Sequence, residues 1–221
     1  MKPYYEAHGI TIYHGDCRAL TLPEKPALVL ADPPYGMNYR HGKGATKNGK
    51  HHNRGHLPPV AGDKEPFDPS HILRLNTPTI LWGANHYADT LPASHAWYVW
   101  DKRDGISSND NSDCELAWAN FGGSIRIYRH VWNGVIRASE NGDKHLHSTQ
   151  KPVALMRWCL LRAKLVPGAL IYDPYMGSGP IAKACKQLGY RYIGCELVEQ
   201  YCETTALGLQ QEVMPLFAES E

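Results

Sequence analysis

Residues 169–185 read "ALIYDPYMGSGPIAKAC", and this stretch decides the fold. An apolar run ends at Asp173, a Gly-Ser-Gly turn follows at 177–179, and a helical pattern then opens with Pro180. Proline suits the first turn of a helix, and glycine lets the backbone approach a ligand closely. A strand, a glycine turn and a helix in this order are typical of α/β nucleotide-binding units. Alone, the turn is a weak signal, because many α/β connections contain such glycines.

Similar apolar runs occur along the rest of the chain. Each is short and continuous and stops at a polar or glycine-containing turn, as expected of strands covered on both faces. The runs lie at 9–16, 27–35, 79–87, 97–102 and 191–196. Helical periodicity lies between some of them: residues 151–168 predict a helix with one apolar stripe, made of Val153, Met156, Leu160 and Ala163. This alternation predicts an open, mostly parallel α/β sheet with helices on both faces.

The composition fits one globular domain, spanning residues 1–221. The chain is 43% hydrophobic and 20% charged, and its net charge of +1 gives no general attraction to a polyanion. Its six cysteines form no C-x-x-C pair, and the start of the chain lacks an apolar signal region, so we expect a cytoplasmic location. No run approaches the roughly 20 apolar residues of a membrane helix, so we expect a soluble protein.

Two segments break the α/β rhythm. Residues 36–62 contain no acidic residue and five cations, Arg40, Lys43, Lys47, Lys50 and Arg54. This basic loop either contacts phosphates or is a solvated insertion. Residues 104–146 begin with a polar, turn-rich stretch and predict a surface excursion. His51, His52 and His56 in the basic loop lack a second ligand cluster at metal spacing, so no metal site is predicted.

The stretch "ADPPYG" at 31–36 follows a predicted strand. Consecutive prolines remove two backbone donors and fix two φ angles, so the segment from Asp32 to Tyr35 is a stiff turn with free carbonyls. A rigid surface turn would have the same sequence. Alternatively, the Asp32 carboxylate and the Pro33 carbonyl are acceptors for an exocyclic amine of a nucleobase on which Tyr35 stacks.

An acidic residue ends the strand that follows the glycine turn. Glu196 lies about 20 residues beyond the glycines, where a carboxylate can accept both hydroxyls of a ribose. A solvated or helix-capping acid is the alternative. No Lys-Ser/Thr pair follows the glycines, which disfavours a P-loop. A cofactor with a ribose and no polyphosphate, such as S-adenosylmethionine, fits this pattern.

Taken together, these motifs resemble a known family. "ADPPYG", "HSTQKP" (147–152) and "DPYMGSG" with "YIGCE" resemble the amino-methyltransferases of DNA, in the circularly permuted group where D-P-P-Y precedes the glycine segment. The match runs from "YHGDCRAL" (13–20) to "ELVEQYCE" (196–203). The resemblance implies a Rossmann-like, S-adenosylmethionine-dependent methyltransferase fold. It also implies methyl transfer to an exocyclic amine of a base flipped out of double-stranded DNA, and a homodimer as an expected state.

The resemblance also implies roles for individual residues. The catalytic segment is Asp32, Pro33, Pro34 and Tyr35. The cofactor loop on the methionine side consists of Asp173, Tyr175, Gly177, Ser178 and Gly179, with Asp32 beside it, and Glu196 is the ribose acceptor. Asp16 and Cys17 are candidates for contact with the cofactor adenine, although Asp16 also suits an ordinary turn. Thr149, Gln150 and Lys151 would close over the methionine moiety, and the basic loop would lie at the mouth that admits the base.

The residue before Pro-Pro-Tyr bears on the target. Enzymes of this family that act on cytosine N4 often have serine there, so Asp32 favours adenine N6. Cytosine N4 stays open as an alternative, as does a catalytically inactive subunit that binds cofactor or DNA. Methylation of RNA or of a protein glutamine is disfavoured, because those enzymes commonly have asparagine at this position and place the cofactor loop first.

Overall fold

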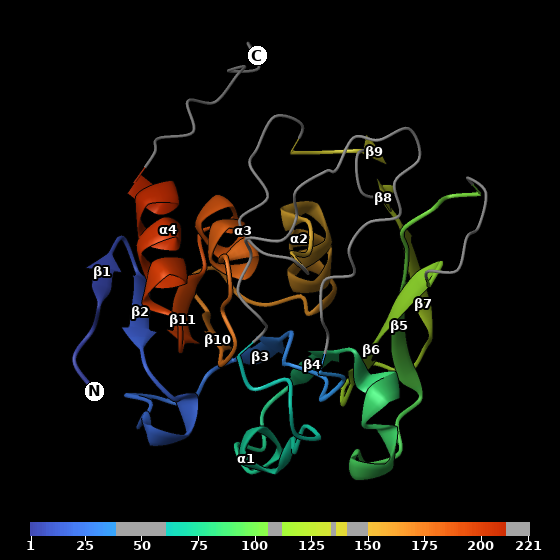
Figure 1. Ribbon diagram of the computed structural model, residues 1–221, viewed down its shortest axis with the longest axis horizontal. Coiled ribbons are helices and arrows are strands. Elements are labelled where there is room, and N and C mark those ends of the chain that lie inside the picture. Colours follow the sequence, from blue (N-terminus) through green and yellow to red (C-terminus); the bar gives the residue numbers. More distant parts are fainter. Residues whose placement is uncertain (39–60, 106–111, 134–135, 141–149, 211–221) are drawn as a thin grey trace.

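The computed structural model describes residues 1–38, 61–105, 112–133, 136–140 and 150–210. Its centre is a nine-stranded sheet in the order β1-β2-β11-β10-β3-β4-β6-β5-β7 (Figure 1). The strands span Tyr5–Ala7 (β1), Ile10–His14 (β2), Leu28–Ala31 (β3), Thr79–Trp82 (β4), Ala96–Asp101 (β5), Cys114–Ala119 (β6), Arg126–Arg129 (β7), Leu170–Asp173 (β10) and Arg191–Glu196 (β11). A separate antiparallel pair consists of β8 (Trp132–Asn133) and β9 (Ile136–Arg137).

Most of the sheet is parallel, as the sequence predicts. Strands β2, β11, β10, β3 and β4 run in one direction, and β6 is inserted antiparallel between β4 and β5. From the adjacent strands β10 and β3, the chain continues outward in opposite directions, to β11 on one side and β4 on the other. Such a switch point is where open α/β sheets bind ligands, just beyond the carboxyl ends of the strands.

Helices and short turns cover the two faces of the sheet. Three helices, α2 (Val153–Arg162), α3 (Pro180–Leu188) and α4 (Glu199–Gln210), lie on one face, above the sheet in Figure 1. The other face carries α1 (Ser70–Leu73) and the 3-10 turns η1 (Cys17–Ala19), η2 (Ala84–His86) and η3 (Ala88–Thr90). Successive side chains of β3 alternate between the two cores: Leu30 packs on the α2–α4 side, and Val29 on the α1 side.

The helix boundaries follow local sequence signals. Helix α3 begins at Pro180, and Gly189 caps it with a left-handed φ of 69°. Helix α2 begins directly after Pro152 but ends at Arg162, before the predicted end at 168, and Lys164 then adopts a positive φ of 51°. The buried apolar residues of both helices belong to the core cluster that also contains Leu30 of β3 and Ile171 of β10.

The expected surface excursion at 104–146 is wrong in its middle. Residues 114–119 form β6, which pairs along its whole length with β5 inside the sheet. The side chains from Ala117 to Ala119 are buried. The run "LAWA" is short and follows polar residues, so it lacks the long apolar character that marks the other central strands. Within the described ranges, no helix combines the length and apolar character needed to cross a bilayer.

Candidate active site

The carboxyl edge of the parallel strands gathers residues that lie far apart in the sequence. Asp32 follows β3, Asp173 ends β10, and Glu196 ends β11. Residues 15–17 follow β2, and residues 83–86 follow β4, at the same edge. The parallel direction of these strands is therefore what brings the predicted catalytic and cofactor segments together.

The turn after β3 is held at both ends. The Tyr35 hydroxyl donates to Asp32 Oδ1 at 2.7 Å. Beyond it, the backbone N–H groups of Gly36 and Met37 donate to Asp63 Oδ1 at 2.8 and 3.1 Å. In the described part of the chain, no hydrogen bond to the Pro33 carbonyl is found. The turn is thus rigid while one of its proposed acceptors remains available.

The Tyr35 ring is fixed by residues that follow β4. A Cβ on Gly83 would lie 1.9 Å from Tyr35 Cε1, so only glycine fits beneath the ring, and Gly83 also has a left-handed φ of 70°. The imidazole of His86 stacks on Tyr35 with 5.0 Å between ring centroids and an interplanar angle of 15°. One face of the tyrosine is therefore already occupied by His86.

The ammonium group of Lys151 lies on the same turn. Its Nζ is 2.5 Å from Asp32 Oδ1, 2.9 Å from the Tyr35 hydroxyl oxygen and 3.2 Å from Glu115 Oε2. The Lys151 side chain is only 3% exposed. The resemblance assigns Lys151 to the cofactor, whereas the structure places its charge on the proposed catalytic carboxylate.

Two further charged residues complete this cluster. Glu115 is the second residue of β6, and its Oε1 accepts a hydrogen bond of 2.9 Å from Lys102 Nζ, just after β5. Burial opposes ionisation of Glu115, but Lys151 and Lys102 together lower the pKa of its carboxyl to about 2. Burial likewise disfavours the charged form of Lys151, and Asp32 and Glu115 overcome it and raise the pKa of the lysine. Glu115 and Lys151 are therefore both charged at neutral pH.

Asp173 has a different environment, although its strand is adjacent to β3. Its carboxyl group is completely buried and accepts hydrogen bonds from the Tyr192 hydroxyl at 2.9 Å and from the Tyr175 N–H at 3.1 Å. Burial raises the pKa of Asp173 to about 8, which the two hydrogen bonds only partly offset. Asp173 therefore anchors the start of the glycine turn, and its burial favours the protonated form.

The two glycines of the turn, Gly177 and Gly179, differ in what surrounds them. A Cβ on Gly179 would lie 2.3 Å from Thr205 Cγ2, so this glycine allows α4 to pack against the turn. A Cβ on Gly177 would meet nothing within 4 Å, and its φ is 53°. The N–H of Gly177 donates to Glu196 Oε2 at 2.8 Å, and burial raises the pKa of Glu196. Open space at Gly177, beside a half-buried carboxylate, is compatible with a bound ligand.

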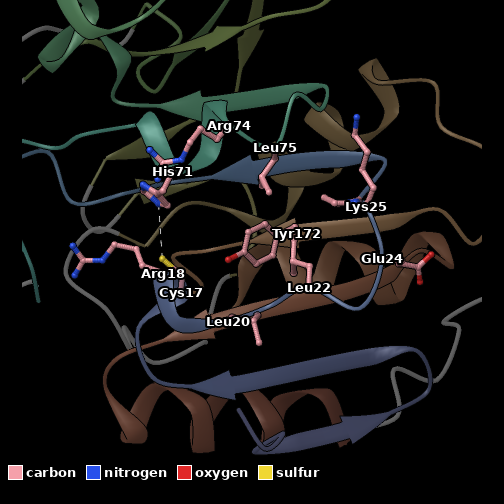
Figure 2. Close-up of a pocket in the computed structure, with 11 residues that line it drawn as sticks. Cys17, Arg18, Leu20, Leu22, Glu24, Lys25, His71, Arg74, Leu75 and Tyr172 are labelled. Carbon is pink, nitrogen blue, oxygen red and sulfur yellow. Dashed lines mark hydrogen bonds between the residues drawn. The ribbon is translucent and has the colours of Figure 1, made fainter.

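Asp16 and Cys17 lie at the end of β2, as predicted. Asp16 caps η1 by accepting from the Arg18 N–H at 2.9 Å, and its carboxylate pairs with the Arg18 guanidinium at 2.6 Å. Cys17 is buried, with Sγ 3.9 Å from His71 Nε2 (Figure 2). The same imidazole nitrogen lies 3.0 Å from the Tyr175 hydroxyl. His71 therefore connects the glycine turn to η1.

An open groove of about 530 Å³ extends from this point along the α1 face of the sheet. Figure 2 shows Cys17 and His71 at one end of the groove and Glu24 and Lys25 at the other, with Tyr172 between them. Of the predicted cofactor residues only Cys17 lines it. The groove therefore runs mainly along the sheet face and meets the carboxyl edge at Cys17.

Several predicted residues lie outside the described ranges, namely Thr149 and the five cations Arg40, Lys43, Lys47, Lys50 and Arg54. Gln150 is described, and its buried Oε1 has no hydrogen-bond partner among the described residues. Buried polar atoms rarely lack a partner, so Gln150 fits a position beside a ligand. The described ranges contain no cluster of three or more histidine, cysteine or acidic residues suited to a metal ion.

Sequence reasoning missed three residues of this site: Asp63, His86 and Glu115. His86 gave a usable signal, because it follows an apolar run in the way that Asp32 and Asp173 do. Glu115 gave none, since it lies in the segment whose sequence predicts a surface excursion.

Comparison with known proteins identifies a family for this chain. The profile of a family described as DNA methylase matches residues 76–207, more than half of the 221 residues. The chain is 33% identical over 90 residues to the type II methyltransferase M.Cfr9I of Citrobacter freundii, covering 41% of this chain and 28% of that protein. This chain covers only 26–28% of the length of M.Cfr9I and of two further curated relatives.

Solved structures share the fold. The M1.HpyAVI–SAM complex is 22% identical, with a TM-score of 0.51 over 90% of this chain and 99% of that chain. The cytosine-N4-specific PvuII DNA methyltransferase is 14% identical, with a TM-score of 0.65 over 96% of this chain and 90% of that chain. The profile match extends from before β4 into α4 and so includes the glycine turn and Glu196; it shows that this chain belongs to the DNA methylase family.

Proposed function

We propose that this protein is an S-adenosylmethionine-dependent DNA methyltransferase that modifies the exocyclic N6 of adenine. One observation carries the proposal. Asp32 lies at the switch point of the sheet, beside the glycine turn, with Oδ1 held by Lys151 and Tyr35. Among the described residues no partner for Oδ2 is found, so this oxygen is available to a substrate.

The residues at the edge fit S-adenosylmethionine. Open space at Gly177, the carboxylate of Glu196 and the unpartnered Gln150 Oε1 supply room, a ribose acceptor and a further acceptor. The M1.HpyAVI structure, which was solved with SAM, has the same fold and supports this choice. When bound, S-adenosylmethionine supplies an activated methyl group, so the chain itself has only to bind and orient.

The turn after β3 would orient the target amine. Asp32 Oδ2 and the Pro33 carbonyl would each accept one N–H, which turns the nitrogen lone pair out of conjugation with the ring. His86 covers one face of Tyr35, so a flipped base would stack on the other face. Positioning of this kind accelerates the reaction because it brings the nitrogen lone pair to an already activated methyl group; the methylated nitrogen then loses one of its protons.

Adenine and cytosine share this mechanism, and the resemblance separates them only through Asp32. Asp before Pro-Pro-Tyr favours adenine, whereas the fold shared with the cytosine-N4-specific PvuII enzyme makes cytosine N4 the second candidate. The test uses bacterial genomic DNA amplified by a polymerase, which carries no methylation. After incubation with labelled cofactor and digestion to nucleosides, we expect N6-methyldeoxyadenosine. Label in deoxycytidine would contradict the adenine target, and no label in DNA would contradict the function.

The basic loop would contribute sequence-independent DNA affinity. Replacement of Lys43, Lys47 and Lys50 by alanine should weaken DNA binding and lower the slope of log K against log salt by about 0.9 for each phosphate that a lysine no longer neutralises. Cofactor affinity should stay unchanged. An unaltered salt slope would mean that the loop is a solvated insertion that does not contact phosphates.

A further inference from the structure

The cluster behind the proposed catalytic turn contains two residues that no motif singles out. We propose that Glu115 and Lys102 are positioning residues for methyl transfer: they hold the Lys151 ammonium on Asp32 Oδ1 and so keep Oδ2 free for the target amine. The inference rests on the proposed function, because it concerns how the same carboxylate is presented.

The hydrogen bonds of Lys151 support this role. An ammonium group has three N–H donors, and Lys151 Nζ has three acceptors within reach: Asp32 Oδ1, the Tyr35 hydroxyl oxygen and Glu115 Oε2. Tyr35 directs its own proton to Asp32 Oδ1. Both the lysine and the tyrosine thus donate to one carboxylate oxygen of Asp32.

Glu115 prevents a competing arrangement. A buried lysine with a single anionic partner would approach both of that partner's oxygens, because removing a charge from water is costly unless it is well compensated. Glu115 supplies a second anion for Lys151, with Nζ and Oε2 3.2 Å apart. Lys102 holds Glu115 Oε1 at 2.9 Å and so fixes the direction in which Oε2 points.

The topology explains how Glu115 reaches this place. β6 runs antiparallel to β4 and β5, so its first residues lie where the neighbouring strands end. Glu115 pairs with Trp100, close to the end of β5, and Lys102 follows that strand. The pairing of β5 with β6 therefore brings one acid and one base to the edge that carries Asp32.

The test separates positioning from a role in stability alone. Glu115→Gln keeps the shape of the side chain and removes its charge. The matched control is Glu24→Gln, which breaks the exposed ion pair with Arg191 at the opposite edge of the sheet. For each variant we would measure kcat and KM on polymerase-amplified genomic DNA, the Kd of S-adenosylmethionine by calorimetry, and the Tm.

We expect kcat of Glu115→Gln to fall on the order of 10- to 100-fold, with KM for DNA and Kd for the cofactor changing less than about 3-fold. Glu24→Gln should keep the wild-type kcat. Lys102→Met should lower kcat by about 3- to 10-fold alone and have no further effect when Glu115 is already glutamine, because it acts through Glu115. A folded Glu115→Gln protein with kcat within about twofold of the wild type would overturn the inference.

Two measures keep the test decisive. If Glu115→Gln fails to fold, the double variant Glu115→Gln/Lys102→Met removes one charge of each sign, and a wild-type kcat in that protein overturns the inference.

Acylation of lysines, read by mass spectrometry, should find Lys151 protected in the wild type and more reactive in Glu115→Gln. Equal reactivity of Lys151 in the two proteins would contradict the proposal that Glu115 keeps Lys151 in place. A wild-type protein that transfers no methyl group to DNA would contradict the proposed function, whereas normal transfer by Glu115→Gln would contradict only this inference.

Discussion

Two aspartates end neighbouring parallel strands, yet their surroundings are opposite. Asp32, after β3, is 22% exposed and has Lys151 and the Tyr35 hydroxyl on one oxygen. Asp173, at the end of β10, is fully buried and has only neutral donors, and its pKa rises to about 8. The difference shows that the role of an acid at this edge depends on the groups that contact it and not on its position at the end of a strand. Asp32 is paired with a cation, whereas Asp173 accepts from the Tyr192 hydroxyl and from a backbone N–H.

The first test of this contrast between Asp32 and Asp173 replaces each acid in turn. Asp32→Ala deletes the proposed acceptor and should lower the single-turnover rate of methyl transfer by about 1,000-fold or more. Asp173→Asn copies a neutral acid and should lower the rate less than about tenfold. Asp89→Ala, in the exposed turn η3, serves as the control. If Asp32→Ala retains more than about a tenth of the activity, the catalytic assignment of Asp32 is wrong.

The second way is to follow stability with pH. The folded-state pKa of Asp173, about 8, lies above its ordinary value of 3.8, so between these values the folded protein holds a proton that the unfolded chain has lost. The contribution of Asp173 to stability is therefore full below about pH 4 and is lost as pH rises toward 8, by about 1.4 kcal/mol per unit at most.

Asp173→Asn should remove this component. Urea unfolding between about pH 5 and pH 8 measures it as the difference between the wild-type and variant free energies of unfolding. That difference should shrink steadily as pH rises. Parallel curves would show that Asp173 is ionised in the folded protein.

The third way concerns the turn that Asp173 holds. Gly179→Ala should cost about 2–3 kcal/mol of stability, from the contact with Thr205 and from a left-handed φ. Adding Thr205→Ala should recover part of this loss. Gly177→Ala has room for its Cβ and should cost only about 1 kcal/mol, while weakening binding of S-adenosylmethionine in calorimetry. Equal losses of stability for the two glycines would refute their separate roles.

The smallest expected effect concerns Tyr35, which contacts Asp32. His86→Ala removes the ring stacked on Tyr35, and such pairs contribute about 0.5–1 kcal/mol, so kcat should fall about 2- to 5-fold. The exposed His95 provides the matched control, as His95→Ala. Unchanged kinetics in His86→Ala would mean that Gly83 and the hydrogen bond to Asp32 suffice to hold Tyr35.

Much of the fold could be predicted because its signals are local. The path from Asp173 through Pro180 to Gly189 needs only a strand pattern, turn residues and helix-capping rules, and the structure confirms it. The insertion of β6 could not be predicted in this way. Its place between β4 and β5 is set by pairing with distant strands, and no property of "CELAWA" specifies those partners.

For the site, proximity of Asp32, Asp173 and Glu196 follows from parallel strands that end at one edge. The side chain that pairs with each acid could not be predicted, because it comes from a distant part of the sequence that approaches the acid only in the folded protein. Lys151 lies 119 residues from Asp32, and Glu115 reaches the edge only because its strand is reversed. A charge cluster of this kind is a property of the register between strands and is visible only in the assembled sheet.

The position of β10 also has a consequence for synthesis of the chain. Strands β2 and β3 are made early, but β11 and β10, which lie between them in the sheet, follow only after β7 and α2. Until then the nascent chain exposes apolar strands with unpaired edges, a state prone to aggregation. We expect chaperone dependence at this stage, and the carboxyl edge as a whole is complete only once β11 and Glu196 have been made.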